Sequence, residues 1–182
     1  MEGYIEFDRF IDLETSLEQL LTQIQRVPMT ASSWKWALIA AHSALQGAVC
    51  IALRGAAGFD TWKPKFLKKW LDAYENKKDL PSTQLDNFMN LFDKLFDKES
   101  EIERDLINSL NEHRNNFIHF NVDHFYIERK LIIDAINESI SAMIAAPRRS
   151  KGVFFYEELQ SQRFDALCES IRERLKVLAD VK

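Results

Sequence analysis

Apolar residues recur every three or four positions over most of the chain, which is the spacing of helices that bury one face. We expect the first helix to end before Pro28. It can begin at Asp8, or later at Thr15, which has the spacing of a capping box with Glu18. The apolar stripe of this helix consists of Leu13, Leu17, Leu20, Leu21 and Ile24.

The second predicted helix, residues 34–54, is apolar on nearly every side and rich in alanine. This composition suits a central helix that its neighbours approach closely, and Gly55 ends it. The same stretch is the best candidate for a membrane span, but His42, Ser43 and Gln46 interrupt it. We therefore interpret it as a buried core helix of a protein that does not enter a membrane.

Two shorter helices are predicted next. Pro64 opens the first, whose outer face carries several lysines, and the second lies within residues 85–96. The apolar faces expected to point inward are Phe66, Leu67, Trp70, Leu71 and Tyr74 in the first, and Leu85, Phe88, Met89, Phe92, Leu95 and Phe96 in the second.

Three longer helices complete the pattern. Ser100 and Glu103 form a capping box for the first of them. Asn121 or Asp123 can cap the second, and Pro147 ends it. The stripes expected in the core are Ile102, Leu106, Ile107 and Leu110 in the first, Tyr126, Ile133, Ile136, Ile140 and Met143 in the second, and Phe164, Leu167, Ile171, Leu175 and Leu178 in the last, residues 155–180.

The sequence has no strand pattern, internal repeat or low-complexity segment. It therefore predicts an all-α bundle of about six to seven helices. We expect two parts. Residues 1–146 form the bundle, and residues 147–182 form a short basic linker and an additional C-terminal helix that packs on the bundle or on a partner chain.

Composition and charge narrow the functions that this bundle can have. A net charge of −4 over 182 residues argues against a protein that coats nucleic acid electrostatically, although a local basic site stays open. Cys50 and Cys168 lack partner spacing, which disfavours a disulfide framework or a zinc site. The acidic N-terminus lacks a basic region followed by an apolar run, so we expect no signal peptide and a cytoplasmic protein.

Residues 110–123 look like the junction of two helices, yet they are packed with polar and ionisable groups. Within this stretch, Arg114 stands one helical step beyond Leu106 and Leu110, where the pattern requires a core residue. Burying a guanidinium without a partner is costly. Arg114 is therefore either held by local acceptors or faces a groove in which an anion can bind.

His119 follows Arg114 by five residues, which turns the two side chains roughly 140° apart on an unbroken helix. Asn115 and Asn116 have poor helix propensity and can let the helix end at this point. His119 could then swing toward Arg114, or toward the same pair on a second subunit.

An Arg and His pair without obvious metal ligands suits the cleavage of RNA. His119 could exchange a proton with the ribose 2′-OH or with the leaving oxygen, and Arg114 could hold the phosphate and stabilise its charge. Asn115 could orient either group by hydrogen bonding. The simpler alternative is that these basic residues only satisfy the last carbonyls and the dipole of the helix.

The segment RNNFIH, residues 114–119, resembles the signature of the HEPN family (higher eukaryotes and prokaryotes nucleotide-binding), which is Arg, a polar residue, a short spacer and His. The context is similar too, because the segment falls between two long helices of an all-α chain, after an alanine-rich helix with an early Trp. The resemblance covers residues 10–146 and makes the expected bundle HEPN-like. The helix after Pro147 lies outside it.

The resemblance implies a metal-independent endoribonuclease of toxin–antitoxin or other defence systems. Such an enzyme binds RNA without a cofactor and acts as a homodimer whose two motifs face one another across a cleft. Carried over, Arg114 and His119 are the catalytic pair, Asn115 supports them, and the products end in a 2′,3′-cyclic phosphate. An antitoxin is then an expected partner.

The same family also contains non-catalytic members that bind nucleotides or act as adaptors, including inert partners of a nucleotidyltransferase. The fold therefore does not by itself predict activity. An interaction module of this second kind is the alternative function, and the acidic net charge of the chain favours it.

Further residues can contribute to substrate binding. Asn116 lies within the motif, and Lys65, Lys68 and Lys69 lie on the short lysine-rich helix, where they can attract a phosphate backbone. Acidic residues are interleaved with these lysines, so an ordinary solvated helix face is the alternative.

The remaining histidines have simpler interpretations. The spacings of His113, His119 and His124 fit no common zinc pattern, so we expect no metal site. His42 lies within the apolar second helix, and we interpret it as a satisfied core histidine.

Overall fold

The protein is an all-helical bundle, as the sequence predicts. The computed structural model describes residues 3–55, 58–96, 101–119 and 123–180, which form seven α-helices and two short 3-10 turns and contain no strand. The elements are α1 (Arg9–Arg26), α2 (Ser33–Leu53), η1 (Phe59–Thr61), α3 (Pro64–Glu75), α4 (Phe88–Leu95), α5 (Arg104–Ile118), α6 (Arg129–Ala145), η2 (Ala146–Arg149) and α7 (Glu158–Asp180).

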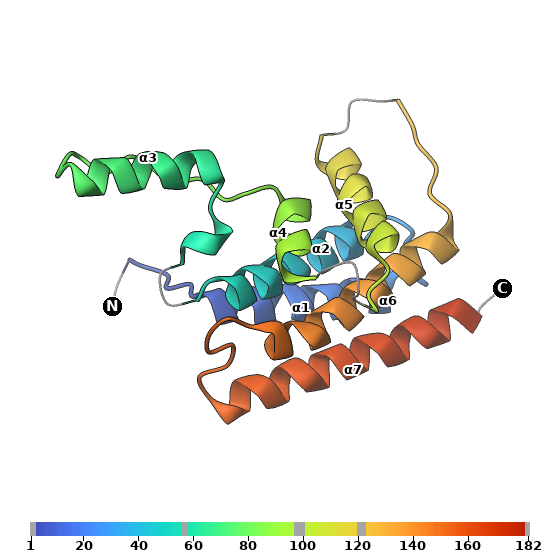
Figure 1. Cartoon of the computed structure of the whole chain (residues 1–182). Helices are drawn as coiled ribbons and strands as arrows, with labels where there is room; N and C mark the ends of the chain where they lie inside the picture. Colours follow the sequence, from blue (N-terminus) through green and yellow to red (C-terminus); the bar gives the residue numbers. More distant parts are fainter. Residues whose placement is uncertain (1–2, 56–57, 97–100, 120–122, 181–182) are drawn as a thin grey trace.

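Helices α1, α2, α6 and α7 form a four-helix bundle (Figure 1). α2 packs against α1 and α6, and α7 closes the ring by packing against the same two helices. α1 and α7 run in one direction, and α2 and α6 run in the opposite one (Figure 1). Apolar side chains from all four helices join one core, so α7 packs on the bundle of its own chain.

α2 is the central helix that its alanines predict. Ala41, Ala44 and Ala48 have no exposed surface, and side chains this small let α1 and α6 approach closely. By length and composition, α2 is also the one helix among the described residues that could cross a membrane. However, 67% of its most apolar window is buried inside the protein, which is the position expected of a core helix.

α1 begins directly after Asp8, which caps it. The Asp8 carboxylate accepts hydrogen bonds from the backbone N–H groups of Phe10 (2.7 Å) and Ile11 (2.8 Å). The alternative start at Thr15 is therefore wrong, because Thr15 lies inside the helix. α1 ends shortly before Pro28, as expected.

α4 packs on α2, and α5 packs on α2 and α6. Leu85 was predicted to belong to the α4 stripe, but it lies in an extended segment that forms an isolated antiparallel bridge with Trp62. The helix starts after Asn87. The Asp86 carboxylate accepts hydrogen bonds from the Asn87 N–H group (2.9 Å) just before the helix and from the Asn90 side chain (3.0 Å) in its first turn. The rest of the stripe is in or against the core, as predicted: Phe88, Met89, Phe92, Leu95 and Phe96.

α5 begins after Glu103, whose backbone N–H group donates to the carboxylate of Glu138 on α6 (2.7 Å). The predicted capping partner, Ser100, lies outside the described residues. Of the predicted stripe, Ile107 and Leu110 are fully buried and Ile102 packs against the core, so these residues hold α5 on the bundle, whereas Leu106 is only half-buried.

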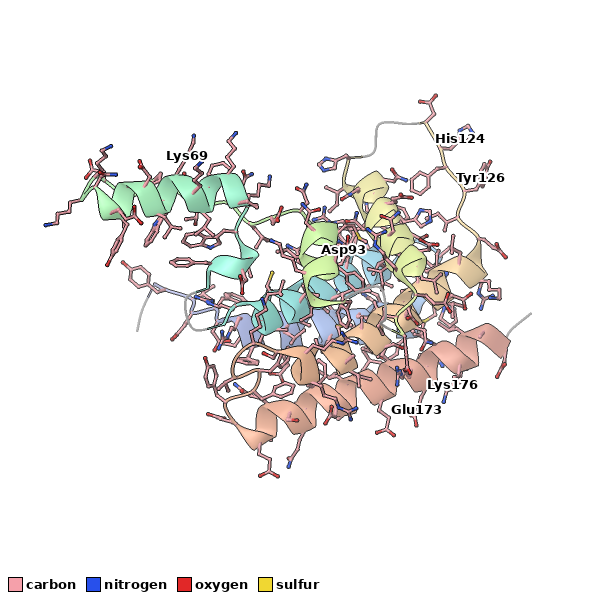
Figure 2. All side chains as sticks on the ribbon, viewed as in Figure 1. Lys69, Asp93, His124, Tyr126, Glu173 and Lys176 are labelled. Atoms are coloured by element: carbon pink, nitrogen blue, oxygen red, sulfur yellow. The ribbon has the colours of Figure 1, made fainter. Side chains whose placement is uncertain are left out.

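α6 begins after Glu128, so the predicted cap Asp123 is too early by five residues. Asn121, the other predicted cap, lies outside the described residues. Tyr126 was expected in the core, but it lies in the extended segment before α6 and is 91% exposed (Figure 2). The other members of that stripe are buried, as predicted: Ile133, Ile136, Ile140 and Met143.

α3 projects away from the bundle (Figure 1), so its apolar face is not the core face that its periodicity predicted. Ala73 is its only buried residue, and Tyr74 is 64% exposed. Its rings instead pack on one another and on η1. Trp70 stacks on Tyr74 with ring centroids 5.4 Å apart. Its centroid also lies 5.4 Å from that of Phe59 and 5.8 Å from that of Trp62.

The basic tract 147–152 attaches the end of α2 to the segment around η1. The backbone N–H group of Lys151 donates to the carbonyl of Ala52 (2.9 Å), and its ammonium group pairs with Asp60 (3.0 Å). α7 then begins three residues later than predicted. Its buried face, packed on α1 and α6, is Phe164, Cys168, Ile171, Leu175 and Leu178.

Candidate functional site, an arginine-lined cavity beside the motif

A cavity of about 670 Å³ opens where α1, α2, α5 and the η1 segment meet. The C-terminal half of α2 supplies much of its lining, from Ser43 to Arg54. The first turn of α1 adds Arg9 and Asp12, and α5 adds Arg114. The rest of the lining comes from Gly58, Thr61, Trp62 and Leu85. The fold therefore brings Arg114 next to residues from far earlier in the chain.

Arg114 is half-buried and incompletely satisfied. Its Nη1 donates to the side-chain oxygen of Asn115 (2.9 Å), while its Nε is buried without a hydrogen-bond partner. Within the part of the chain that the structure describes, no carboxylate forms an ion pair with it. The sequence left two alternatives for Arg114, local acceptors or a groove for an anion. The structure shows one local acceptor, Asn115, and an open cavity beside it. A half-buried cation in this state favours an anionic ligand.

Two further arginines line the same cavity. Arg54 follows the last residue of α2 and is exposed, and its side chain has no hydrogen bond or ion pair within residues 3–55, 58–96, 101–119 and 123–180. Arg9 donates to the Tyr156 hydroxyl, and its guanidinium lies 4.9 Å from the centroid of that ring. The lining thus holds three guanidinium groups and a single carboxylate, that of Asp12, although the whole chain has a net charge of −4.

His42 is the histidine whose pKa the charge of Arg114 lowers, and its side chain is 2% exposed. Its Nε2 lies 3.1 Å from the side-chain oxygen of Asn111 on α5, and its Nδ1 is buried without a partner. Burial, and then the charge of Arg114, lowers the pKa of His42 to about 4, although the hydrogen bond to Asn111 acts to raise it. This core histidine is therefore neutral at pH 7.

Cys50 lines the cavity but cannot act as a nucleophile there. Burial, and then the neighbouring carboxylate of Asp12, raises the pKa of the Cys50 thiol to about 11. A thiol that stays protonated at neutral pH is unreactive. The chemistry open to the cavity is thus the binding of an anion and hydrogen bonding, with no activated thiol.

His119 does not line the cavity with Arg114. It is exposed at the end of α5, and its backbone N–H group donates to the carbonyl of Asn115 (2.8 Å). The expectation that the helix ends at Asn115 and Asn116 is wrong, because α5 continues to Ile118. An unbroken helix turns residues five apart by roughly 140°, so Arg114 and His119 diverge within one copy of the chain.

Packing explains why the last turn of α5 stays helical. Phe117 is half-buried against the core, and its ring lies 5.0 Å from that of Phe125 in the segment that follows. The helix propensity of asparagine is a weak preference, at most about 0.7 kcal/mol per residue below that of alanine, so tertiary packing of this kind can override it. Asn115 accepts a hydrogen bond from Arg114, the kind of contact predicted for it. Asn116 is exposed.

The other predicted substrate-binding residues lie elsewhere. Lys65, Lys68 and Lys69 are exposed on α3, and none of them lines the cavity. Figure 2 shows Lys69 on this helix, which projects from the bundle. Arg9 and Arg54, which do line it, were missed by sequence reasoning. Neither belongs to a motif, and only the crossing of α1 and α2 brings them together.

The histidines around the motif do not form a cluster. His113 is half-buried with an unpartnered Nδ1, and burial lowers its pKa, opposed by the charge of Glu112. His124 is exposed in the extended segment before α6 (Figure 2). In the described ranges, no group of three or more His, Cys, Asp or Glu side chains is placed to hold a metal ion.

Comparison of the chain with family models, with curated proteins and with solved structures finds no match. The HEPN resemblance stays a prediction that depends on residues 114–119 and their helical context. The geometry of the cavity is independent of that resemblance and provides a separate line of argument about function.

Proposed function

We propose that the protein is a HEPN-like, metal-independent endoribonuclease that acts as a homodimer in a toxin–antitoxin or other defence system. The observation that carries this proposal is the state of Arg114. Its half-buried guanidinium has Asn115 as its only hydrogen-bond partner among the described residues, and it faces a cavity that two more arginines line. A phosphodiester supplies the charge and the acceptors that this group lacks.

Three residues of the motif have roles in the reaction. Arg114 binds the scissile phosphate and stabilises the charge that develops on it. Asn115 positions the guanidinium by accepting its Nη1 hydrogen bond. The ribose 2′-oxygen attacks phosphorus and the bond to the 5′-oxygen breaks, which leaves a 2′,3′-cyclic phosphate and a 5′-hydroxyl. His119 takes the 2′-OH proton or protonates the departing oxygen.

The homodimer is part of the proposal because one copy separates the two catalytic residues. His119 is exposed at the end of α5, beside Ile118, which is 44% exposed. A twofold pairing of these helix ends would bring the motif of one copy to that of the other. An antitoxin that covers the paired helix ends would repress such an enzyme.

RNA cleavage in the presence of EDTA tests this function. We expect cleavage to persist in EDTA and to fall by about 10²-fold or more in Arg114→Ala and in His119→Ala, the usual contribution of such groups. Arg26→Ala and His124→Ala are matched controls, because both residues are exposed and neither lines the cavity. Circular dichroism and gel filtration verify the fold and the mass of each variant. Unchanged cleavage by both motif variants, as folded dimers, would contradict the proposal.

A non-catalytic module that binds a nucleotide or acts as an adaptor, for example as the partner of a nucleotidyltransferase, is the second candidate. It is favoured by the absence of His119 from the lining of the cavity and by the low pKa of His42, the histidine that Arg114 influences. In that case the purified chain cleaves no RNA under any of these conditions, while Arg114→Ala still weakens the binding of a nucleotide.

A further inference from the structure

We propose that the cavity is a binding subsite for one nucleotide of single-stranded RNA, with Arg54 on a phosphate next to the scissile one and Trp62 stacked on the base. This inference rests on the proposed function for its substrate class. Arg54 and Trp62, however, lie outside the motif, although Arg114 lines the same cavity, and neither of the two is needed for the chemical step.

The size and lining of the cavity suit a ligand larger than a simple anion. Its volume of about 670 Å³ falls within the range of small-molecule sites, which is about 300–1,000 Å³. Asp12 places a carboxylate among the guanidinium groups, and Ser43 and Gln46 add neutral hydrogen-bonding groups. A carboxylate repels a bare phosphate but accepts hydrogen bonds from hydroxyl or amino groups. The lining therefore favours a ligand that carries such donors as well as a phosphate, as a ribonucleotide does.

Arg54 is placed to bind a phosphate at the rim of this cavity. The Gly58 N–H group donates to the Arg54 carbonyl (2.7 Å), and Gly58 has a φ of 71°, which favours glycine. A Cβ atom at Gly58 would lie 3.6 Å from Cγ of Arg54, so Gly58 lies directly beside the arginine stem. Gly58 thus lies against the base of the Arg54 side chain, while the guanidinium stays free of ion pairs within the described part of the chain.

Trp62 presents a supported aromatic surface to the same cavity. Its backbone is fixed by the bridge to Leu85, with hydrogen bonds from Lys63 N–H to the Gln84 carbonyl and from Asp86 N–H to the Thr61 carbonyl (each 2.9 Å). Two neighbouring rings contact the indole, Phe59 at 5.1 Å and Trp70 at 5.8 Å between centroids. A partly exposed indole held in this way can serve as a stacking surface for any base.

Binding of a short oligouridylate tests the subsite. The RNA carries a fluorescent label, and anisotropy is measured in EDTA with the full chain bearing His119→Ala, so that no cleavage competes with binding. We expect Arg54→Ala and Trp62→Ala each to weaken binding by about tenfold or more. Trp62→Phe keeps an aromatic surface and should retain most of the affinity. Unlabelled uridine monophosphate should compete with the RNA, and inorganic phosphate should compete far less.

Two matched controls separate the subsite from general effects of charge and surface. Arg26 lies at the opposite end of α1 from Arg9, and Trp36 is 51% exposed in the first turn of α2, far along that helix from Arg54. Arg26→Ala and Trp36→Ala should bind within about twofold of the parent chain. Absence of binding by the parent, equal losses in the controls, or a loss in Arg54→Ala without one in folded Trp62→Ala would each overturn the nucleotide subsite.

The cleavage assay and the binding assay can fail separately. If no cleavage is found but binding depends on Arg54 and Trp62, the subsite stands and the nuclease proposal fails. If cleavage depends on Arg114 and His119 but both subsite variants keep the binding and the KM of the parent, the nuclease stands and the subsite fails.

Discussion

The pKa of the buried His42 depends on its neighbour Arg114, which lines the cavity. The His42 imidazole is neutral at pH 7 and is hydrogen-bonded to Asn111, so Arg114 alone carries a positive charge here. Protonation of His42 would place a second cation in a position that is 2% exposed, next to a guanidinium. The residue is therefore a point at which acid should destabilise the fold.

We predict that acid destabilises the protein through His42 between pH 6.5 and about pH 4. The pKa of His42 is about 4 in the folded state and 6.5 in the unfolded chain, so the unfolded state takes up a proton first as the pH falls. The stabilisation is complete above pH 6.5, and its loss reaches about 3 kcal/mol near pH 4. Urea unfolding at pH 7 and pH 4 measures it. His42→Gln, which keeps an amide for Asn111 but does not titrate, should lose correspondingly less; equal losses in both proteins would contradict the assignment.

At the scale of secondary structure, Asp86 connects α4 to the wall of the cavity. Its carboxylate accepts hydrogen bonds from the Asn87 N–H group (2.9 Å), from Asn90 (3.0 Å) and from Lys94 (2.9 Å), and its own N–H group donates to the Thr61 carbonyl. Burial alone would raise the pKa of Asp86, but these hydrogen bonds outweigh it and lower the pKa. The Asp86 side chain therefore holds the start of α4, while its backbone N–H group connects that start to the segment that carries Trp62.

We predict that Asp86→Ala lowers the free energy of unfolding by about 2 kcal/mol, because three donors lose their acceptor in a largely buried place. Since the folded state lowers this pKa, the stabilisation is present above the unfolded pKa and is lost as the pH falls further. Thermal unfolding at pH 7 measures the effect. Asp93→Ala is the control, because Asp93 pairs with Arg104 at the surface and should contribute less than about 1 kcal/mol. Similar losses in the two variants would contradict the role of Asp86.

At the scale of the whole molecule, α7 completes the ring of four helices. It is the last element of the chain, yet its buried side chains belong to the same core as those of α1 and α6. The Arg129 side chain also donates to the carbonyl of Leu178 (2.7 Å), which joins the start of α6 to the end of α7. α7 therefore behaves as part of the fold rather than as an appendage.

We predict one cooperative thermal transition for the chain, with α7 included in it. Ile171→Ala should cost about 2–4 kcal/mol, because Ile171 has no exposed surface between α7 and its neighbours. Val177→Ala is the matched control on the same helix, since Val177 is 51% exposed, and it should change stability by less than about 0.5 kcal/mol. Calorimetry that resolves two transitions, with Ile171→Ala affecting only one of them, would show that α7 folds separately.

Helical periodicity predicted the helices well but predicted their surroundings less well. The stripes of α1, α2, α6 and α7 lie in the core, because each has a neighbour along its length. The stripe of α3 has the same pattern, but Trp70 and Tyr74 pack on each other and on η1 instead. Tyr126 and Leu85 fit the period as well, yet both lie in extended segments. Periodicity shows that a segment has an apolar face, while only the other elements decide whether that face is covered.

The sequence by itself determined the all-α fold and marked Arg114 as a cation at a core position. Both follow from spacings of three to four residues, which act along one helix and need no knowledge of its neighbours. The tertiary structure decided that Arg9 and Arg54 share a cavity with Arg114, and that His119 lies apart from them. The first depends on where α1, α2 and α5 cross. The second depends on the contact of Phe117 that keeps the last turn of α5 helical, and local propensity encodes neither.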